Sequence, residues 1–273
     1  MNRAIGLHLR CNQSLMELVE KAARLELPLF QCFLRLPAGP IIATNAKEIA
    51  TFKDYCSRYS QLFVHASYRI NLADASLNRH PALKQELYWA QKLGFTHMIL
   101  HPGASPAYDE GIDAIVRALN TLLKSARDIT IILENVAFTN PSIGGTITDL
   151  QLIRDKLDEP DRLGFCIDTA HAYAFGYDLA DKVGREEYIA LLGQTIGFEH
   201  IKLIHINDTD STLGSRHDVH CRMGKGNIGT QALKEFALDP RLLHIPLLLE
   251  LPAIEESEEK QDLMTVRSWH QPL

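Results

Sequence analysis

Short apolar segments recur at fairly even intervals along this chain, and polar or amphipathic segments separate them. Eight of them stand out: AIGLHL from Ala4, LFQCFLR from Leu29, QLFVHAS from Gln61, HMILHPG from His97, ITIILEN from Ile129, LGFCIDTAH from Leu163, IKLIHIND from Ile201 and IPLLLEL from Ile245. Their near-continuous hydrophobicity is typical of parallel strands that are buried on both faces. The pattern therefore predicts eight strands.

Helical periodicity fills several of the intervals between these segments. SLMELVEKAARL from Ser14 and GIDAIVRALNTLLKSA from Gly111 each place their apolar residues on one face. A third helix, from Pro81, is predicted to end at Gly94, because glycine commonly follows the last helical residue. In TDLQLIRDKL, Thr148 and Gln151 have the spacing of a capping box, which predicts a helix start.

Eight strand-helix units with no evident linker, repeat or low-complexity segment predict one fold for residues 1–273, a single (β/α)8 TIM barrel. The length of 273 residues suits such a barrel, which needs about 250 residues. A doubly wound sheet is the alternative. It would normally use five or six strands, and no glycine-rich dinucleotide fingerprint follows the first predicted strand.

The composition narrows the class of protein. The N-terminal MNRAIGLHLRCNQS lacks the apolar run of a signal peptide, and no stretch approaches the roughly 18 apolar residues of a membrane span. The five cysteines include no C-x-x-C pair, which argues against a disulfide framework or a thiolate zinc site and favours the cytoplasm. A net charge of −6 gives no support to nucleic-acid binding by bulk electrostatics, although bound cations would add local positive charge.

Ionisable residues close six consecutive predicted strands, and in a TIM barrel the carboxyl ends of the strands carry the active site. These residues are His65, His101, Glu134, Asp168, His205 and Glu250, with His171 just beyond Asp168. A lone histidine at a strand end is usually structural, but six coincidences on one rim are much less frequent. Glu134 and Glu250 close apolar runs, and a buried carboxylate needs a partner because its desolvation is costly. A divalent cation would supply that partner.

The donor set of imidazole and carboxylate without thiolate favours zinc, with manganese or iron as alternatives, over magnesium or calcium. We interpret Cys166, deeper on the same strand face as Asp168, as a packing residue. The segment GSRHDVH from Gly214 is predicted to be a loop over the same rim. Asp218 and His220, two residues apart on an extended segment, would point the same way, and His217 would point away.

These motifs together resemble the endonuclease IV family, metal-dependent abasic-site endonucleases with a (β/α)8 fold. The matching stretches are HASYRINLA, LHPGAS, LENVA, CIDTAHAYAFGYD, HINDTDSTLGSR followed by DVH, and GKGNIG, between His65 and Gly229, with Glu250 added by the eighth strand. The resemblance implies three Zn²⁺ ions, with Mn²⁺ or Fe²⁺ as alternatives at some sites. By the same resemblance the ligands are His65, His101 and Glu134 for the first ion, Glu134, Asp168, His205 and Glu250 for the second, and His171, Asp218 and His220 for the third.

The resemblance further implies a hydrolase that cleaves duplex DNA 5′ to abasic sites in base excision repair, by a trinuclear-zinc mechanism with Glu134 as the shared catalytic ligand. The expected substrate contacts are His8, Tyr68, Lys225 and Asn227. We expect a monomer. The chain departs from the family's usual loops after the first, second and fifth strands, where it reads LRCNQSL, LRLPAGPII and AFTNPSIGG.

Two other classes of protein share part of this pattern. A xylose isomerase-like enzyme that isomerises or epimerises a sugar or sugar phosphate, with one or two divalent metals, would also have the glutamates of strands five and eight. His65, His101 and the pair Asp218 and His220 favour the nuclease instead, since an isomerase needs no third metal. A non-catalytic metal-binding protein is the third class. Nine ligands for three ions argue against it, because they leave coordination positions open for water and substrate.

Overall fold

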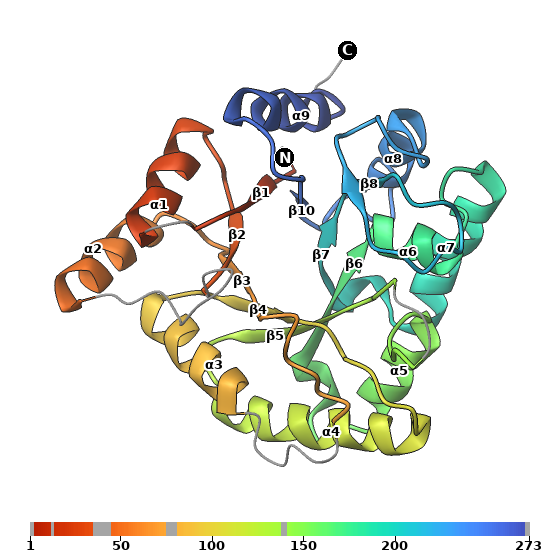
Figure 1. Ribbon diagram of the computed structural model, residues 1–273, viewed down its shortest axis with the longest axis horizontal. Helices are drawn as coiled ribbons and strands as arrows, with labels where there is room; N and C mark the ends of the chain where they lie inside the picture. The colour runs from red at the N-terminus through yellow and green to blue at the C-terminus, as the bar shows by residue number, and fades with distance from the viewer. Residues whose placement is uncertain (1–2, 12–13, 35–44, 75–80, 138–140, 271–273) are drawn as a thin grey trace.

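Eight parallel strands close into a barrel in the computed structural model, and helices surround it (Figure 1). The structure describes residues 3–11, 14–34, 45–74, 81–137 and 141–270. The strands follow the order β1-β10-β7-β6-β5-β4-β3-β2, in which β10 pairs with β1 and completes the ring. The predicted TIM barrel is therefore confirmed, and the doubly wound alternative is excluded because its sheet would stay open.

The elements have the following bounds. The barrel strands are β1 (Ile5–Leu9), β2 (Phe30–Phe33), β3 (Phe63–His65), β4 (His97–Leu100), β5 (Thr130–Glu134), β6 (Leu163–Asp168), β7 (Ile201–His205) and β10 (Leu247–Leu249). The helices are α1 (Leu15–Arg24), α2 (Ala46–Cys56), α3 (Pro81–Leu93), α4 (Tyr108–Ser125), α5 (Ile147–Asp155), α6 (Thr169–Phe175), α7 (Lys182–Thr195), α8 (Thr230–Ala237) and α9 (Glu256–Ser268). Short 3-10 turns precede β6 (Pro160–Arg162) and β7 (Phe198–His200), and β8 (Asp208–Thr209) pairs antiparallel with β9 (His220–Cys221).

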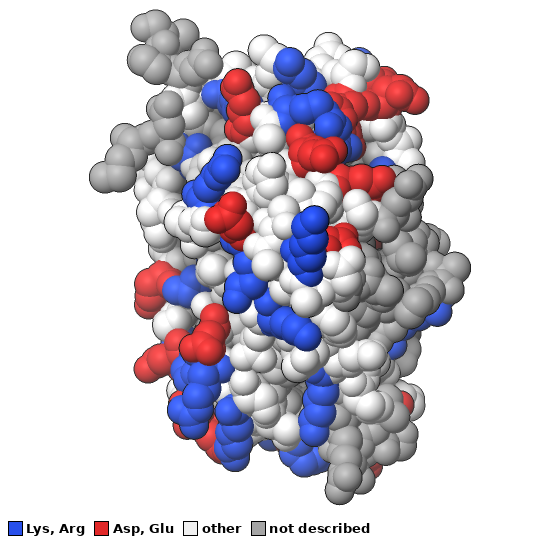
Figure 2. Space-filling view, turned by 90° about the vertical axis from the view of Figure 1, so that its left-hand side faces the viewer, with Lys and Arg blue, Asp and Glu red and all other residues white. Residues whose placement is uncertain are grey.

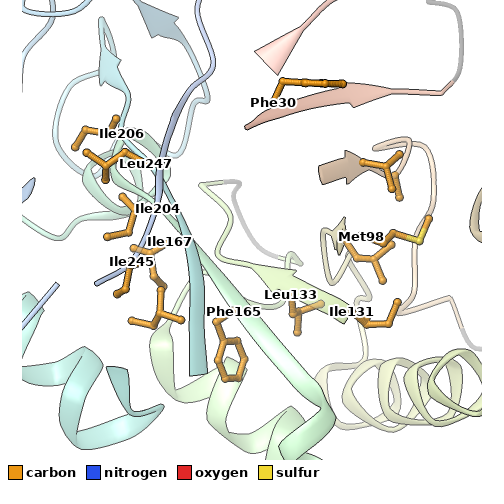
Figure 3. Packing of buried hydrophobic residues seen from close by; sticks show 14 of the residues in the cluster. Phe30, Met98, Ile131, Leu133, Phe165, Ile167, Ile204, Ile206, Ile245 and Leu247 are labelled. Carbon is orange, nitrogen blue, oxygen red and sulfur yellow. The ribbon is translucent and has the colours of Figure 1, made fainter. Parts of the chain in front are cut away.

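Side chains alternate along each strand between two buried layers. The larger layer lies between the strands and the helices. Ile131, Leu133, Phe165 and Ile167 belong to it (Figure 3). The intervening positions fill the interior of the barrel. Their side chains are Leu29, Phe63, Ile99, Ile132, Cys166, Leu203 and Leu248. A strand buried on both sides must be apolar at odd and even positions alike, which explains why the segments show little alternation.

Two predicted element boundaries differ from the structure. α5 begins at Ile147 with Thr146 as its N-cap, whose side chain accepts a hydrogen bond from the Asp149 N–H, so the predicted capping box at Thr148 is wrong. β6 ends at Asp168, and the rest of the predicted strand, through His171, is the start of α6. Gly94, with a φ of +86°, follows the end of α3 as predicted.

The five cysteines form no disulfide in the part of the chain that the structure describes, which includes all of them, and each is buried. None of the described helices has the length and apolar content that a membrane span needs.

Candidate metal centre

A ring of polar side chains lies at the carboxyl ends of the strands, inside the barrel. Alternation along each strand explains its formation, because a residue two positions beyond an interior apolar residue also points inward. Ile132 precedes Glu134, Leu203 precedes His205 and Leu248 precedes Glu250 in this way. Every barrel strand contributes one polar member. The ring consists of His8, Gln31, His65, His101, Glu134, Asp168, His205 and Glu250.

Glu134 lies at the centre of the predicted ligands and is fully buried. Its Oε2 is 3.0 Å from Nε2 of His65 and 3.3 Å from Nε2 of His101. Its Oε1 is 3.0 Å from Nδ1 of His205 and 3.4 Å from Nδ1 of His171. One carboxylate thus has an oxygen directed at each of two groups of histidines. The sequence analysis assigned Glu134 to the first and second ions, and its two oxygens face histidines assigned to the first, second and third ions.

The expected second group surrounds His205. Its Nδ1 lies 3.3 Å from Oε2 of Glu250 and 3.7 Å from Oδ2 of Asp168, in addition to its contact with Glu134. The donor atoms of Glu134, Asp168, His205 and Glu250 lie within 4.8 Å of one another, which is close enough for all four to reach one cation. Three carboxylates and one imidazole suit a hard or borderline divalent ion.

The third group joins α6 to the segment that leads into β9. Nε2 of His171 lies 3.2 Å from Oδ2 of Asp218, and Nε2 of His220 lies 3.1 Å from Oδ1 of Asp218. Both Nε2 atoms are buried, yet neither has a hydrogen bond of acceptable geometry from any residue that the structure describes. Buried polar atoms without hydrogen bonds are costly, so the space that they face suits a cation. Asp168 is close enough to both histidines to join this group.

The side chains beside Asp218 and His220 are directed as the alternation predicts. Val219 is 47% exposed, and His217 is exposed while its backbone carbonyl accepts a hydrogen bond from Ser211. Cys221, next to His220, is buried beside Asp208 and Asp210 rather than beside the histidines of the third group, and burial raises its pKa to about 12. It therefore stays a neutral thiol.

Cys166 lies closer to the predicted ligands than a packing residue needs to lie. Its Sγ is within 4.8 Å of donor atoms of Glu134 and His205, although its place in the interior apolar layer agrees with the packing interpretation. Burial raises the pKa of its thiol to about 12, which agrees with a neutral packing residue in the metal-free protein.

Neighbouring carboxylates and histidines of the centre shift one another's pKa values. Burial disfavours an imidazolium at His220, but the negative charges of Asp168 and Asp218 overcome this effect and raise the His220 pKa to about 9. Burial likewise disfavours a charged Glu134, yet the imidazolium of His205 keeps the pKa of Glu134 well below its usual range. Protons on His171, His205 and His220, whose pKa values are raised, thus balance the carboxylates in the metal-free protein, and a bound cation would replace those protons.

Backbone and amide contacts hold the predicted ligands, and the sequence analysis did not identify the residues that make them. Asn135 accepts from the Asp168 N–H at 2.7 Å and donates to the Asp168 carbonyl at 3.1 Å. Asn207 donates to Oδ2 of Asp168 at 2.6 Å and accepts from the Glu250 N–H at 2.7 Å. Asn135 directly follows Glu134 in LEN, and Asn207 lies two residues after His205 in HIND; this nearness to predicted ligands is the signal that could have revealed them.

A pocket of about 660 Å³ opens over the ring, and predicted ligands such as His65 and His220 line its wall. Of the predicted substrate contacts, His8 and Tyr68 line this pocket. Tyr68 is 70% exposed and packs edge-on against Phe33 with ring centroids 5.5 Å apart.

Lys225 and Asn227, the other two predicted substrate contacts, do not line the pocket. Lys225 is exposed outside it. The amide of Asn227 donates to the carbonyls of Asp210 and Ser211 and so secures the turn between β8 and α8. Of the three divergent loops, residues 35–44 and 138–140 lie outside the described residues, as do residues 12–13.

Comparisons with known proteins agree with this geometry. Residues 19–269 match the family model described as xylose isomerase-like TIM barrel. The probable endonuclease 4 of Thermosipho africanus is 34% identical over 230 residues, which cover 81% of each chain. The crystal structure of endonuclease IV from Thermus thermophilus superposes with a TM-score of 0.82 at 29% identity and covers 97% of this chain and 98% of that one. A D-tagatose 3-epimerase-like protein shares the fold at a TM-score of 0.69 and 20% identity, covering 97% of both chains.

Proposed function

Because this chain belongs to the endonuclease IV family of xylose isomerase-like TIM barrels, we propose that it cleaves duplex DNA 5′ to abasic sites, as a cytoplasmic monomer, at a centre of three Zn²⁺ ions. Membership of this family makes it a DNA-cleaving hydrolase that depends on divalent metal. The number and identity of the metals, the lesion and the strand position are the proposed part.

The nine side chains fit such a centre. His65, His101 and Glu134 would hold the first ion, Glu134, Asp168, His205 and Glu250 the second, and His171, Asp218 and His220 the third. The buried Nε2 atoms of His171 and His220 lack hydrogen bonds among the described residues, so each could coordinate a cation without breaking one. When bound, the cations would supply Lewis-acid activation of a water molecule and would neutralise the charge that develops on the phosphoryl oxygens.

The protein's own part is to hold these donors apart in fixed positions. Glu134 separates two groups of histidines with its two oxygens, and the backbone N–H of His171 is fixed by Asp168. Beneath the ring, the interior apolar layer, which includes Ile132 and Leu203, seals the site from water on one side. The pocket above them gives substrate and solvent access to the donors.

The group formed by His171, Asp218 and His220 is the observation that carries this proposal. An isomerase with one or two metals needs no third cluster of ligands, so nothing in its reaction would require histidine or aspartate at these three positions. Instead two buried histidines converge on one carboxylate at 3.2 and 3.1 Å.

The proposed contact with DNA is local, because the chain carries a net charge of −6. On the side formed by α1, α2 and α3, Lys and Arg side chains are spread singly and Asp and Glu side chains lie between many of them (Figure 2). Arg10 and Arg69 line the pocket beside Tyr68 and bring positive charge to its mouth. Together with bound cations they would attract a phosphate backbone that the protein as a whole repels.

A nicking assay tests the proposal directly. The zinc-loaded protein is incubated with a duplex that carries one abasic analogue and with the same duplex without it, and elemental analysis counts the metal per chain. We expect a single cut 5′ to the analogue, a 3′-hydroxyl end, suppression by EDTA and three ions per chain. The absence of cutting by micromolar protein with three ions bound would contradict the nuclease, and turnover of a sugar phosphate would then support an isomerase.

A further inference from the structure

The side chain of Gln31, on β2, lies inside the ring and contacts two predicted ligands of the second ion. It is fully buried. Its Nε2 lies 2.6 Å from Oε1 of Glu250 and 2.8 Å from Nδ1 of His8, and its Oε1 lies 2.9 Å from Nε2 of His205. Gln31 therefore connects β2 to the strands that carry His205 and Glu250, on the side of these residues that faces away from the other carboxylates.

The carboxylate of Glu250 determines which way the amide points. An ionised carboxylate accepts hydrogen bonds and cannot donate them, so the group 2.6 Å from it must be the NH₂ of Gln31. The reverse orientation would place two acceptor oxygens together in a buried site, at the cost of a lost hydrogen bond. The amide oxygen is then necessarily the atom that faces His205.

The amide oxygen in turn determines the tautomer of His205. Because that oxygen can only accept, Nε2 of His205 must carry the hydrogen. In the metal-free protein Nδ1 also carries a proton, which it donates to the Glu134 carboxylate. A cation at this site would displace the Nδ1 proton, because the Nε2–H is held by the amide of Gln31, and Nδ1 would then offer its lone pair. Nδ1 is the nitrogen that faces Glu134 at 3.0 Å and Glu250 at 3.3 Å. The orientation of the Gln31 amide thus decides which nitrogen of His205 would coordinate metal.

Other histidines of the centre achieve the same result with backbone carbonyls and with the opposite nitrogen. Nδ1 of His65 lies 2.7 Å from the Ala66 carbonyl, and Nδ1 of His171 lies 2.9 Å from the Asn135 carbonyl. Both therefore direct Nε2 at the carboxylates. His205 relies on a side chain instead, and a side chain can be replaced by mutation.

We propose that Gln31 is a positioning residue that selects Nδ1 of His205 as its coordinating atom and holds the carboxylate of Glu250 beside it. The proposal rests on the metal centre proposed above and extends it to a residue that touches no cation itself. Outer partners of this kind affect metal affinity about 10–100-fold. The dependence of two ligands on one amide places Gln31 at the upper end of that range.

The test compares Gln31→Met, Gln31→Glu and the control Gln91→Ala, whose half-buried glutamine on α3 donates to the Ser125 carbonyl of α4 and contacts no predicted ligand. Methionine keeps the volume and removes the hydrogen bonds to His8, His205 and Glu250, whereas glutamate keeps an acceptor for His205. Zinc affinity is measured by competition with a chromophoric chelator, and ¹⁵N NMR of the zinc-loaded protein reports which nitrogen of His205 carries the proton. Circular dichroism checks the fold of each variant.

For Gln31→Met we expect zinc affinity at one site to fall about 10–100-fold, kcat on an abasic duplex to fall with KM unchanged, and the protected Nε2–H signal of His205 to be lost. For Gln31→Glu we expect that signal to be retained, and Gln91→Ala should match the wild type. Wild-type affinity and an unchanged His205 signal in Gln31→Met would overturn the role of Gln31 alone. A wild-type protein that binds no zinc would overturn the proposed centre and this inference together.

Discussion

The backbone N–H of His171 donates a hydrogen bond to Oδ1 of Asp168 at 2.8 Å, so one predicted ligand fixes the start of the helix that carries another. The second oxygen, Oδ2, accepts from Asn207 at 2.6 Å and lies 3.6 Å from Nε2 of His220. A single carboxylate thus acts as the N-cap of α6 and as part of the proposed metal centre. These two roles depend on different chemistry, because the cap needs only an acceptor whereas a cation favours a negative charge.

Substitutions at Asp168 separate the two roles. Asparagine caps helices as well as aspartate does, whereas alanine in an N-cap costs about 1 kcal/mol. We expect Asp168→Asn and Asp168→Ala both to lose bound zinc and activity, with the alanine variant about 1 kcal/mol less stable than the asparagine variant in the metal-free state. Urea unfolding and elemental analysis measure the two effects. A full complement of zinc in Asp168→Asn would refute its role as a ligand.

The third group is tested by Asp218→Ala beside His217→Ala. Asp218 contacts both His171 and His220, whereas His217 is exposed. We expect Asp218→Ala to bind one ion fewer and to lose most of its nicking activity while its far-ultraviolet circular dichroism is unchanged. His217→Ala should keep three ions and full activity. If Asp218→Ala cut abasic DNA at the wild-type rate, its proposed role would be wrong.

Glu134→Gln should be the most damaging conservative change in the centre. It keeps the shape of a side chain that contacts four histidines but removes the charge that pairs with them. We expect loss of the first two ions and a fall in kcat of at least about 100-fold, since a direct ligand matters more than the outer partners that cost 10–100-fold. The exposed Glu110→Gln is the matched control. Retention of three ions by Glu134→Gln would contradict the bridging assignment.

The metal-free protein should lose stability as the pH rises from neutral. The folded-state pKa of His220 is raised to about 9 by its carboxylate partners, whereas an unfolded histidine titrates near 6.5. Its proton therefore stabilises the folded protein fully below pH 6.5, and this contribution of about 3 kcal/mol declines as the pH rises to 9. Urea unfolding of the EDTA-treated protein between pH 6 and 9.5 measures the decline.

Zinc affinity should rise over the same pH range, because the cation must displace that proton. His220→Gln in the metal-free state is the control, and its stability should decline less with pH than that of the wild type, since it removes one of the histidines whose pKa values are raised. A flat stability profile for the metal-free wild type would show that His220 is not protonated in the fold.

Tyr68→Ala should weaken binding of DNA without affecting the metals. Tyr68 is exposed at the mouth of the pocket, and stacking of an aromatic side chain on a base is worth about 1–3 kcal/mol. We expect a higher KM for the abasic duplex and three ions per chain. Tyr88→Ala, which removes an exposed tyrosine from α3, is the control. Equal KM values for the two variants would assign Tyr68 a structural role.

The sequence contained most of what positions the barrel and its polar ring. Apolar runs are required by burial on both faces, so all eight strands were recognisable, and the gathering of polar residues at their ends followed from the parallel topology. Gln31 was not predicted as a site residue, because glutamine carries no charge that demands a partner. It is nevertheless a polar residue within the apolar run LFQCFLR, just as Glu134 is within ITIILEN. Thr146 was not predicted as the N-cap of α5 for a different reason. Its neighbour Thr148 offers an equally good local signal, and tertiary contacts decide between them.

Hydrogen bonds between segments that are far apart along the chain could not be predicted from the sequence. Asn207 touches Asp168 and Glu250, which are 39 and 43 residues away, and no local pattern relates them. The same limit applies to Asn227, whose amide secures backbone carbonyls rather than facing the pocket. The local sequence pattern identifies the polar residues at strand ends, but it does not indicate which distant residues the loop side chains bond.

The pairing of β10 with β1 has a consequence for the order of events during synthesis. Glu250 follows β10, near the end of the chain, and its oxygen meets side chains from β1, β2 and β7. The last strand must therefore emerge from the ribosome and join the first before the second group is complete. A nascent chain would hold His65, His101 and Glu134 long before that moment, so zinc acquired early could occupy one group of donors, while full loading must wait until translation has passed residue 250.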